Sequence, residues 1–165
     1  MITYNRKPTR LKHYNYSENG VYFITICAKN KRKVFGKVVG GGALDAPFVV
    51  LSPIGKIAEK HIRSTEKIEG VVLKNFVVMP NHIHLLVSIE RADCRGGTSR
   101  APSPTNDVIP RLVAILKRLI NIDAGKNIFQ RSYHDHIVRN EKDYLRIWEY
   151  IDNNPAKWNL DCFYM

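Results

Sequence analysis

Two histidines separated by a single residue, His82 and His84, lie inside the apolar segment 77–90. In a strand, side chains alternate between the two faces, so both imidazoles would share one face while Ile83 and Leu85 point to the other. Two imidazoles on one apolar face are costly to bury without partners. Neutral imidazoles are common ligands of divalent metals, zinc among them, and a site needs at least one further donor. The spacing is therefore typical of a metal site, and the alternative is two ordinary strand histidines.

The segment 140–154 can supply the further donor. At helical spacing its apolar stripe consists of Tyr144, Ile147, Trp148 and Ile151. Tyr150 falls beside this stripe, with Asn154 four residues later and Asp143 seven residues earlier, so one edge of the helix carries a phenol, an amide and a carboxylate. The amide oxygen of Asn154 would complete a metal site whose substrate side faces Tyr150. The alternative is that Tyr150 is an ordinary boundary tyrosine and Asn154 a helix C-cap.

The elements that position these residues follow from the apolar pattern. Residues 20–28 are predicted to form a buried strand. Residues 33–52 are predicted to form two short strand-like pieces around a glycine-rich turn, either a hairpin or a flexible excursion. A helix is expected from an N-cap at Ser52 to a stop at Gly70. Residues 71–80 and 82–90 read as two strands that pair antiparallel through a tight turn.

The second half of the chain predicts two more helices and a strand. Residues 107–124 form a helix with a predicted apolar stripe of Leu112, Ile115, Leu116 and Leu119. A short strand is expected around residues 136–138, and the last helix begins at an Asn140 cap and ends before Pro155. The order of elements predicts an α+β fold, with an antiparallel sheet covered by helices.

The charge balance points to a polyanionic partner. The chain of 165 residues has 26 Lys and Arg against 15 Asp and Glu, a formal net charge of +11, and such an excess favours nucleic acid. We expect one domain, with a basic tail over about residues 1–17 and a mobile loop over about residues 91–106. The residues expected to contact phosphates are Arg6, Lys7, Arg10, Lys12, Lys117 and Arg118.

The hydrophobic segments are too short for a membrane protein. None approaches the ~20 residues of a membrane span, and the basic N-terminus is not followed by the apolar block of a secretory signal. The sequence therefore predicts a cytoplasmic protein with no membrane partner.

Two segments together resemble a known family. "MPNHIHLLV" is similar to the histidine, hydrophobic, histidine motif of the HUH endonucleases, and "RSYHDHIVRNEKDYLRIWEYIDNNPAKW" resembles the C-terminal signature of the single-tyrosine HUH transposases, particularly the REP-associated tyrosine transposases. The resemblance extends from the strand near Tyr22 to Trp158. Each motif is short, but the two occur in the right order and at a plausible separation.

The resemblance implies a ferredoxin-like HUH domain that cuts single-stranded DNA with a tyrosine and a divalent metal, for which we expect Mg²⁺ or Mn²⁺. By position, His82 and His84 match the metal-binding histidines, Tyr150 matches the nucleophile, and Asn154 matches a polar metal ligand. Asp143 matches no assigned role. Enzymes of this kind are monomers or dimers, and we expect a homodimer.

The implied chemistry is consistent with the residues. A phenol with a pKa near 10 is a poor nucleophile at neutral pH unless its proton is removed or its anion is stabilised, which a nearby metal favours. Attack by Tyr150 would leave a 5′-phosphotyrosine and a free 3′-hydroxyl, and the reverse attack would rejoin strands. The expected substrate is hairpin or REP-like DNA with a single-stranded foot. The alternatives are a nucleic-acid binding protein without catalysis and a metal-dependent nuclease that uses an activated water.

Overall fold

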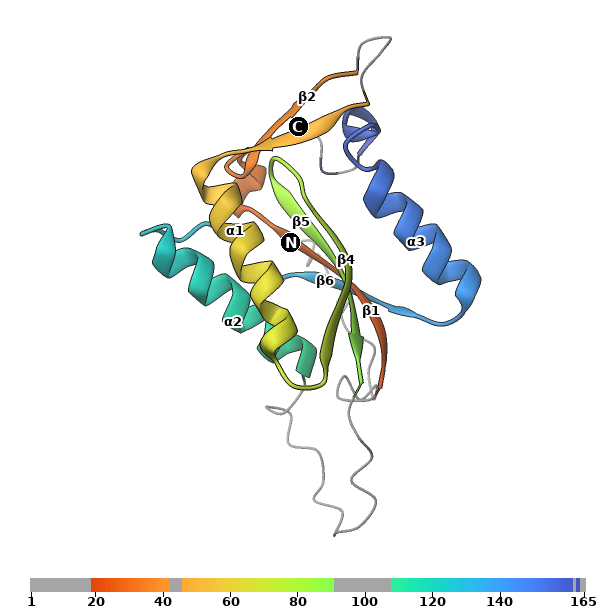
Figure 1. Cartoon of the computed structure of the whole chain (residues 1–165). Coiled ribbons are helices and arrows are strands. Elements are labelled where there is room, and N and C mark those ends of the chain that lie inside the picture. The colour runs from red at the N-terminus through yellow and green to blue at the C-terminus, as the bar shows by residue number, and fades with distance from the viewer. Residues whose placement is uncertain (1–18, 42–45, 91–107, 162, 164–165) are drawn as a thin grey trace, which may run out of the picture.

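A four-stranded antiparallel sheet in the order β4-β5-β1-β6 forms the centre of the protein. The computed structural model describes residues 19–41, 46–90, 108–161 and 163 (Figure 1). The strands are β1 (Gly20–Cys27), β2 (Gly36–Val39), β3 (Phe48–Leu51), β4 (Val71–Val78), β5 (His82–Ile89) and β6 (His134–Val138). The helices are α1 (Pro53–Arg63), α2 (Val108–Asp123) and α3 (Glu141–Asn153). The predicted basic tail, its four candidate DNA contacts and the predicted loop at 91–106 lie outside the described residues.

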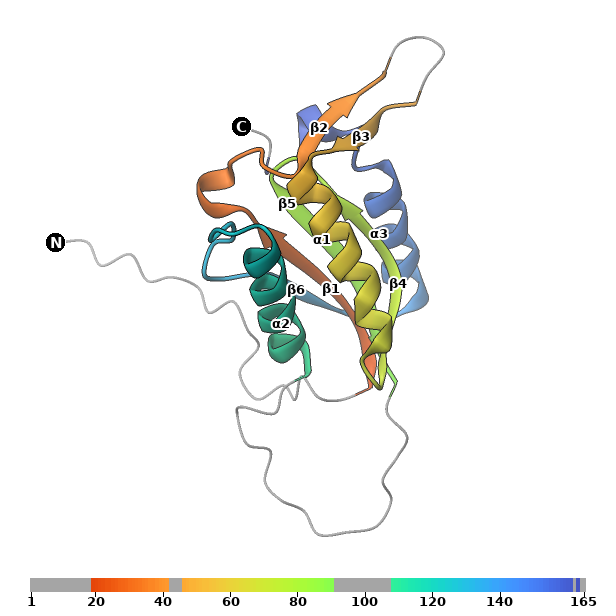
Figure 2. The same cartoon turned by 60° about the vertical axis from the view of Figure 1, so that its left-hand side comes forward.

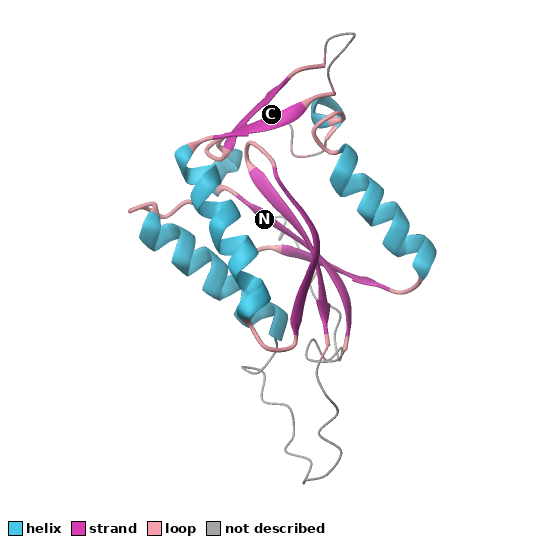
Figure 3. Ribbon diagram, in the orientation of Figure 1, coloured by secondary structure: helices cyan, strands magenta, loops and turns pink. Residues whose placement is uncertain are grey.

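Helices cover both faces of the sheet. Helices α1 and α2 lie on one face and α3 on the other (Figures 1 and 2), and Figure 3 shows the strands in magenta between these two layers. The side chains of β5 that belong to the larger core cluster, with α1 and α2, are Ile83, Leu85, Val87 and Ile89. On the opposite face, Leu86 packs with Ile147 and Ile151 of α3. The predicted α+β architecture is confirmed. Within the described residues, no helix is long and apolar enough to cross a membrane.

Residues at both ends of helix α1 account for where it begins and ends. The hydroxyl of Ser52 accepts a hydrogen bond from the backbone N–H of Gly55 at 3.0 Å, and Pro53 occupies the first helical position. The α-helix ends at Arg63 and continues as a 3₁₀ turn over Ser64–Lys67 before Gly70, whose φ is 76°. The predicted helix is therefore correct in its start and shorter in its regular part.

The buried stripe of α2 differs from the prediction. The buried residues of this helix are Val108, Ile109, Leu112, Val113, Leu116 and Ile120. Leu112 and Leu116 were expected there, but Leu119 is 36% exposed and Ile115 is only partly buried. The face centred on Leu112, Val113 and Leu116 packs with the sheet and α1, so the expected placement of Ile115 and Leu119 at its centre is wrong.

The glycine-rich segment before α1, for which the sequence left two alternatives, forms a hairpin. Strands β2 and β3 pair antiparallel as a separate two-stranded sheet near the turn between β4 and β5 (Figure 1). The backbone N–H of Phe35 donates to the carbonyl of Pro80 at 3.0 Å, and the Phe35 carbonyl accepts from the Ser52 N–H at 2.8 Å. A Cβ at Gly55 would lie 1.9 Å from the Phe35 carbonyl oxygen, so glycine permits this approach. These contacts fix the turn that leads into His82.

A β-bulge interrupts the pairing of β4 with β5. Leu73 is opposite Val87 and Asn75 is opposite Leu86, so Lys74 has no partner of its own in the register. Its ammonium group instead contacts the Glu90 carboxylate at 3.0 Å.

Candidate metal and nucleophile site

The two histidines lie at the start of β5, on the sheet face that carries α3. The exposed fractions of His82 and His84 are 0% and 1%. His84 Nδ1 shares a hydrogen bond of 2.9 Å with the hydroxyl of Thr25, its partner on β1. This partner holds the ring so that Nε2, the other nitrogen, is directed away from β1.

Asn81 determines which nitrogen of His82 carries the proton. The Asn81 amide nitrogen donates to the Phe163 carbonyl at 2.8 Å and to the Lys31 carbonyl at 3.3 Å. The amide oxygen of Asn81 therefore faces His82 Nδ1 at 2.8 Å, and because this oxygen only accepts, Nδ1–H is the donor. The lone pair of His82 is consequently on Nε2, which is the arrangement that a metal-ligating imidazole requires.

The environment keeps both imidazoles neutral. Burial lowers the pKa of His82 from 6.5 to about 4, although the Asp161 carboxylate opposes this shift. Burial, with a contribution from the neighbouring His82, also holds the pKa of His84 well below its ordinary value. Near pH 7 both side chains are therefore uncharged and present lone pairs, the state that binds a cation.

Helix α3 brings Tyr150 and Asn154 to the histidines. Ile147 and Ile151 are buried against the sheet, so the residues beside them on the helix face β5. The Tyr150 hydroxyl lies 3.4 Å from His84 Nε2. Tyr150 is nevertheless 38% exposed to solvent. Asn154 is 2% exposed. The four residues singled out from the sequence thus lie together, with the phenol at the solvent side.

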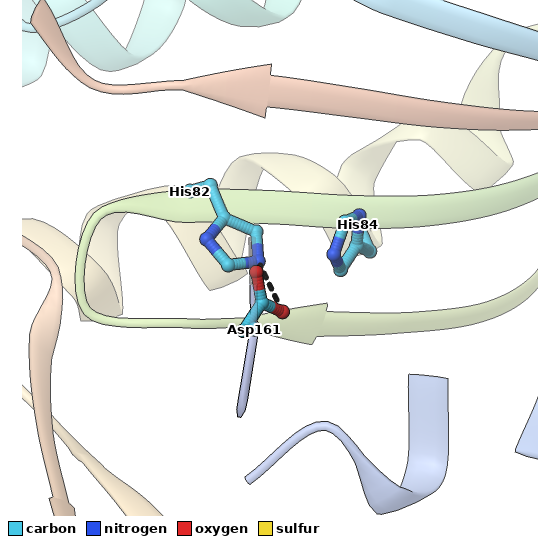
Figure 4. Close-up of side chains that lie close together, drawn as sticks. All are labelled: His82, His84 and Asp161. Atoms are coloured by element: carbon cyan, nitrogen blue, oxygen red, sulfur yellow. Dashed lines mark ion pairs between the residues drawn. The ribbon is translucent and has the colours of Figure 1, made fainter. Parts of the chain in front are cut away.

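Asp161 is the member of this site that sequence reasoning missed. Its carboxylate oxygen Oδ2 accepts from the Tyr150 hydroxyl at 3.2 Å and from the Asn154 amide at 3.0 Å, and lies 3.9 Å from His82 Nε2 (Figure 4). One possible ligand atom from each of His82, His84 and Asp161 lies within 4.8 Å of the others. Asp161 follows a 3₁₀ turn, and the only sequence signal was a carboxylate among apolar residues.

Two orphaned atoms indicate that the site suits a cation. His82 Nε2 and Asn154 Oδ1 are buried and have no hydrogen-bond partner among the described residues. Leaving such atoms unpaired costs about 1–3 kcal/mol each, and both offer a lone pair. The Asn154 amide is oriented by its N–H bond to Asp161, so its oxygen is the free atom. Imidazole nitrogens with carboxylate and amide oxygens form a donor set that accepts Mn²⁺, Zn²⁺ or, less readily, Mg²⁺.

Asp143 is not part of this site. Its carboxylate pairs with His136 Nε2 at 2.7 Å and with Arg146, and these hydrogen bonds lower its pKa to about 2. Its backbone N–H donates to the side chain of the Asn140 cap. Asp143 therefore stabilises the start of α3, two turns from Tyr150. The carboxylate that lies with the Tyr150 phenol and the Asn154 amide is that of Asp161, not that of Asp143 as the helical spacing had suggested.

The candidate phosphate contacts on α2 have different surroundings. The Lys117 ammonium donates to the backbone carbonyls of Gln130 at 2.9 Å, Arg131 at 3.2 Å and Ser132 at 2.9 Å. Burial lowers the pKa of Lys117. Arg118 is exposed. Both residues lie on the helical layer opposite α3, so neither is beside the histidines.

Lys117→Ala is expected to lower the free energy of unfolding by about 1–3 kcal/mol, because it leaves three carbonyls of the segment 130–132 without their donor. Arg118→Ala, at an exposed position of the same helix, should change it by less than about 0.5 kcal/mol. Urea unfolding of both variants measures the difference. Equal stability of the two variants would contradict this structural role of Lys117.

The metal-free protein is expected to lose about 2 kcal/mol of unfolding free energy between pH 7 and pH 5 from His82 alone. The unfolded chain takes up a proton near the ordinary histidine pKa of 6.5, and the folded protein does so only near 4. The stability associated with neutral His82 is therefore fully present above pH 6.5 and is lost as the pH falls towards 4.

Denaturant unfolding in the presence of a chelator, repeated at several pH values, measures this loss. His82→Gln should reduce the loss between pH 7 and pH 5 without abolishing it, because His84 is also buried with a lowered pKa and still contributes. A wild-type profile that is flat between pH 7 and pH 5 would rule out the buried neutral imidazole.

Comparison with known proteins identifies relatives of the chain. No family model matches it. An uncharacterized protein of Haemophilus influenzae is 34% identical over 176 residues, covering 98% of this chain and 94% of the relative. The REP-associated tyrosine transposase of Escherichia coli is 23% identical over 142 residues, covering 86% of this chain and 70% of the relative. A solved REP-associated tyrosine transposase, bound to a REP hairpin, has a TM-score of 0.63 at 21% identity and covers 92% of this chain and 75% of that chain.

The structural match confirms the predicted fold, because the antiparallel sheet and its helices superpose on those of a tyrosine transposase of the HUH type. The sequence matches extend over nearly the whole chain in one relative and over most of it in the other. The chain therefore belongs to one family with the Haemophilus influenzae protein and is similar, in sequence and in fold, to the REP-associated tyrosine transposases.

Proposed function

We propose that this protein nicks and rejoins single-stranded DNA through a covalent 5′-phosphotyrosine at Tyr150. The observation that carries the proposal is the position of the Tyr150 hydroxyl, 3.4 Å from His84 Nε2 and 3.2 Å from Asp161 Oδ2. A nucleophile beside a cation-binding cluster is the arrangement needed for phosphoryl transfer. Relationship to tyrosine transposases supports an enzyme of this kind.

The residues of the chain have separable roles in the proposed reaction. His82, His84 and Asp161, with the amide oxygen of Asn154, would hold a divalent ion, Mg²⁺ or Mn²⁺. When bound, such an ion would offset negative charge on a phosphate oxygen and so favour attack at the phosphorus. Thr25 and Asn81 orient the two imidazoles through their Nδ1 atoms.

Tyr150 would perform the bond exchange. Its phenolic oxygen attacks the phosphorus, a phosphorus–oxygen bond to the tyrosine forms, and the bond between phosphorus and the 3′-oxygen of the preceding nucleotide breaks. The phenolic proton passes to solvent or to the Asp161 carboxylate, which already accepts the hydroxyl, and the 3′-oxygen takes up a proton. One phosphodiester replaces another, so a 3′-hydroxyl can reverse the attack and join strands without ATP.

The proposed substrate is hairpin DNA with an unpaired foot. A phosphate within a duplex is difficult to place between β5 and α3, whereas a single strand can bend into the site. The solved relative is bound to a REP hairpin, which supports a hairpin or REP-like substrate here. The phosphate contacts that remain proposed are Lys117 and Arg118 of α2 and the tail residues Arg6, Lys7, Arg10 and Lys12.

A denaturing gel tests the proposal. The protein is incubated with labelled single-stranded oligonucleotides that contain hairpins, with Mn²⁺, with Mg²⁺ and with a chelator. We expect a metal-dependent adduct that survives denaturation. Cleavage without an adduct would instead indicate a nuclease that uses activated water, and binding without either product would indicate a nucleic-acid binding protein.

A further inference from the structure

A pocket of about 740 Å³ separates the β2–β3 hairpin from the turn that follows α3. Its walls come from three parts of the chain: the hairpin, the β4–β5 turn at Pro80, and the segment 155–159. The volume lies within the usual range of ~300–1,000 Å³ for small-molecule sites and exceeds what a water cluster between side chains requires. The residues given a role in the proposed reaction do not line this pocket.

The pocket adjoins the metal and nucleophile site. Pro80 precedes His82 by two residues, and Pro155 directly follows Asn154. Trp158 is shared, because it lines the pocket and its ring centroid lies 5.9 Å from that of His82. A strand whose phosphate reaches the histidines would therefore bring a neighbouring nucleotide to the pocket. Figure 1 shows the hairpin and the C-terminal end of α3 at the same end of the central sheet, beside the β4–β5 turn.

The chemistry of the walls suits a nucleotide. The charged side chains that line the pocket are Lys33 and Lys37, and among its described lining residues none is acidic. Proline, valine, alanine and tryptophan side chains supply apolar surface, and Asn159 supplies an amide that can donate to and accept from a base edge. Apolar walls, one amide and two ammonium groups are the components that bind an unpaired base with its phosphate.

We propose that this pocket binds an unpaired nucleotide next to the scissile phosphate and so helps to select the position of cleavage. This inference rests on the proposed function, because it assumes a single strand at the adjacent site. The nucleotide would place its base against the apolar wall and Asn159, and its phosphate near Lys33 and Lys37. The pocket would then act on the choice of phosphate and not on the bond exchange at Tyr150.

The experiment measures binding without cleavage. Tyr150→Phe protein is titrated, by fluorescence anisotropy, into a labelled hairpin oligonucleotide and into a set in which each unpaired position in turn is abasic. The same titrations are made with Ala156→Trp added, which fills the pocket from an exposed position, and with Asn159→Ala added, which removes the amide. Thermal melting verifies that each variant is folded.

We expect one abasic position to weaken binding by about tenfold in the Tyr150→Phe protein. The same position should cost less than about twofold once Ala156→Trp or Asn159→Ala is present, because the base then has no pocket to lose. Lys37→Gln should weaken binding more than Lys56→Gln, a matched loss of one charge at an exposed position of α1.

Two outcomes would overturn the inference in different ways. If the oligonucleotides bind but the abasic penalty is the same in Ala156→Trp and Asn159→Ala as in their parent, the pocket does not hold the base, and the proposed function stands. If no oligonucleotide binds to any of the proteins, the proposed function and this inference both fail.

Discussion

Tyr150→Phe is expected to abolish the covalent protein–DNA adduct, with a loss of cleavage of at least about a thousandfold. Phenylalanine keeps the ring that packs edge-on to Phe23 at 6.0 Å and beside His84 at 5.2 Å. It removes only the oxygen that would attack phosphorus. The folded structure and noncovalent DNA binding should therefore be preserved while the chemistry is lost. A denaturing gel measures the amount of covalent adduct and the amount of cleaved DNA.

Tyr144→Phe is the matched control, because it removes a phenolic oxygen from the same helix six residues earlier. Tyr144 lies beside Trp148 at a ring distance of 5.7 Å and packs, partly buried, against the cluster of Leu86, Ile147 and Ile151. Its variant should form the adduct at the wild-type level. An adduct that persists in Tyr150→Phe would exclude Tyr150 as the nucleophile and move the search to another tyrosine of the chain.

Asp161→Asn is expected to weaken Mn²⁺ binding by at least about tenfold to a hundredfold. The substitution keeps the shape of the side chain but removes its negative charge from a site that otherwise offers two neutral imidazoles and an amide. It also places an amide where the Asn154 amide and the Tyr150 hydroxyl now donate. Electron paramagnetic resonance of free Mn²⁺ during titration measures the affinity without any DNA.

Asp152→Asn provides the comparison for this measurement. Asp152 is exposed on α3, and its carboxylate accepts from the Asn75 amide at 2.8 Å. Its variant carries the same change in net charge and should bind Mn²⁺ as the wild type does, whereas His82→Gln should lose affinity as Asp161→Asn does. Unchanged affinity in Asp161→Asn would reduce Asp161 to a structural hydrogen-bond acceptor.

Much of the fold could be predicted because each element buries one face, and the period of the apolar residues reports that burial. The strand pair that carries His82 and His84 and the helix that carries Ile147 and Ile151 are both present where the pattern placed them. The prediction of the buried residues of α2 was correct for only part of the stripe. Val113 and Ile115 are both apolar, and only the tertiary packing decides which of them is buried.

The site was predictable where its residues repeat at the period of an element. The spacing of His82 and His84 and the helical phase of Tyr150 and Asn154 are local signals. Asp161 has no such signal, because it reaches the site only when the chain returns after the 3₁₀ turn Trp158–Leu160. The hydrogen-bond partners of Lys117 could not be predicted either, because they are backbone carbonyls of a loop and do not depend on residue type.

The bulge at Lys74 has a consequence for how chain length can vary among relatives. Because Leu73 and Asn75 already face consecutive partners on β5, deletion of Lys74 would leave a regular ladder with every other side chain on its present face. A deletion elsewhere in β4 would instead reverse the faces of the residues on one side of the change. We therefore expect a one-residue gap in β4 to be tolerated at this position, where it leaves the approach to His82 undisturbed.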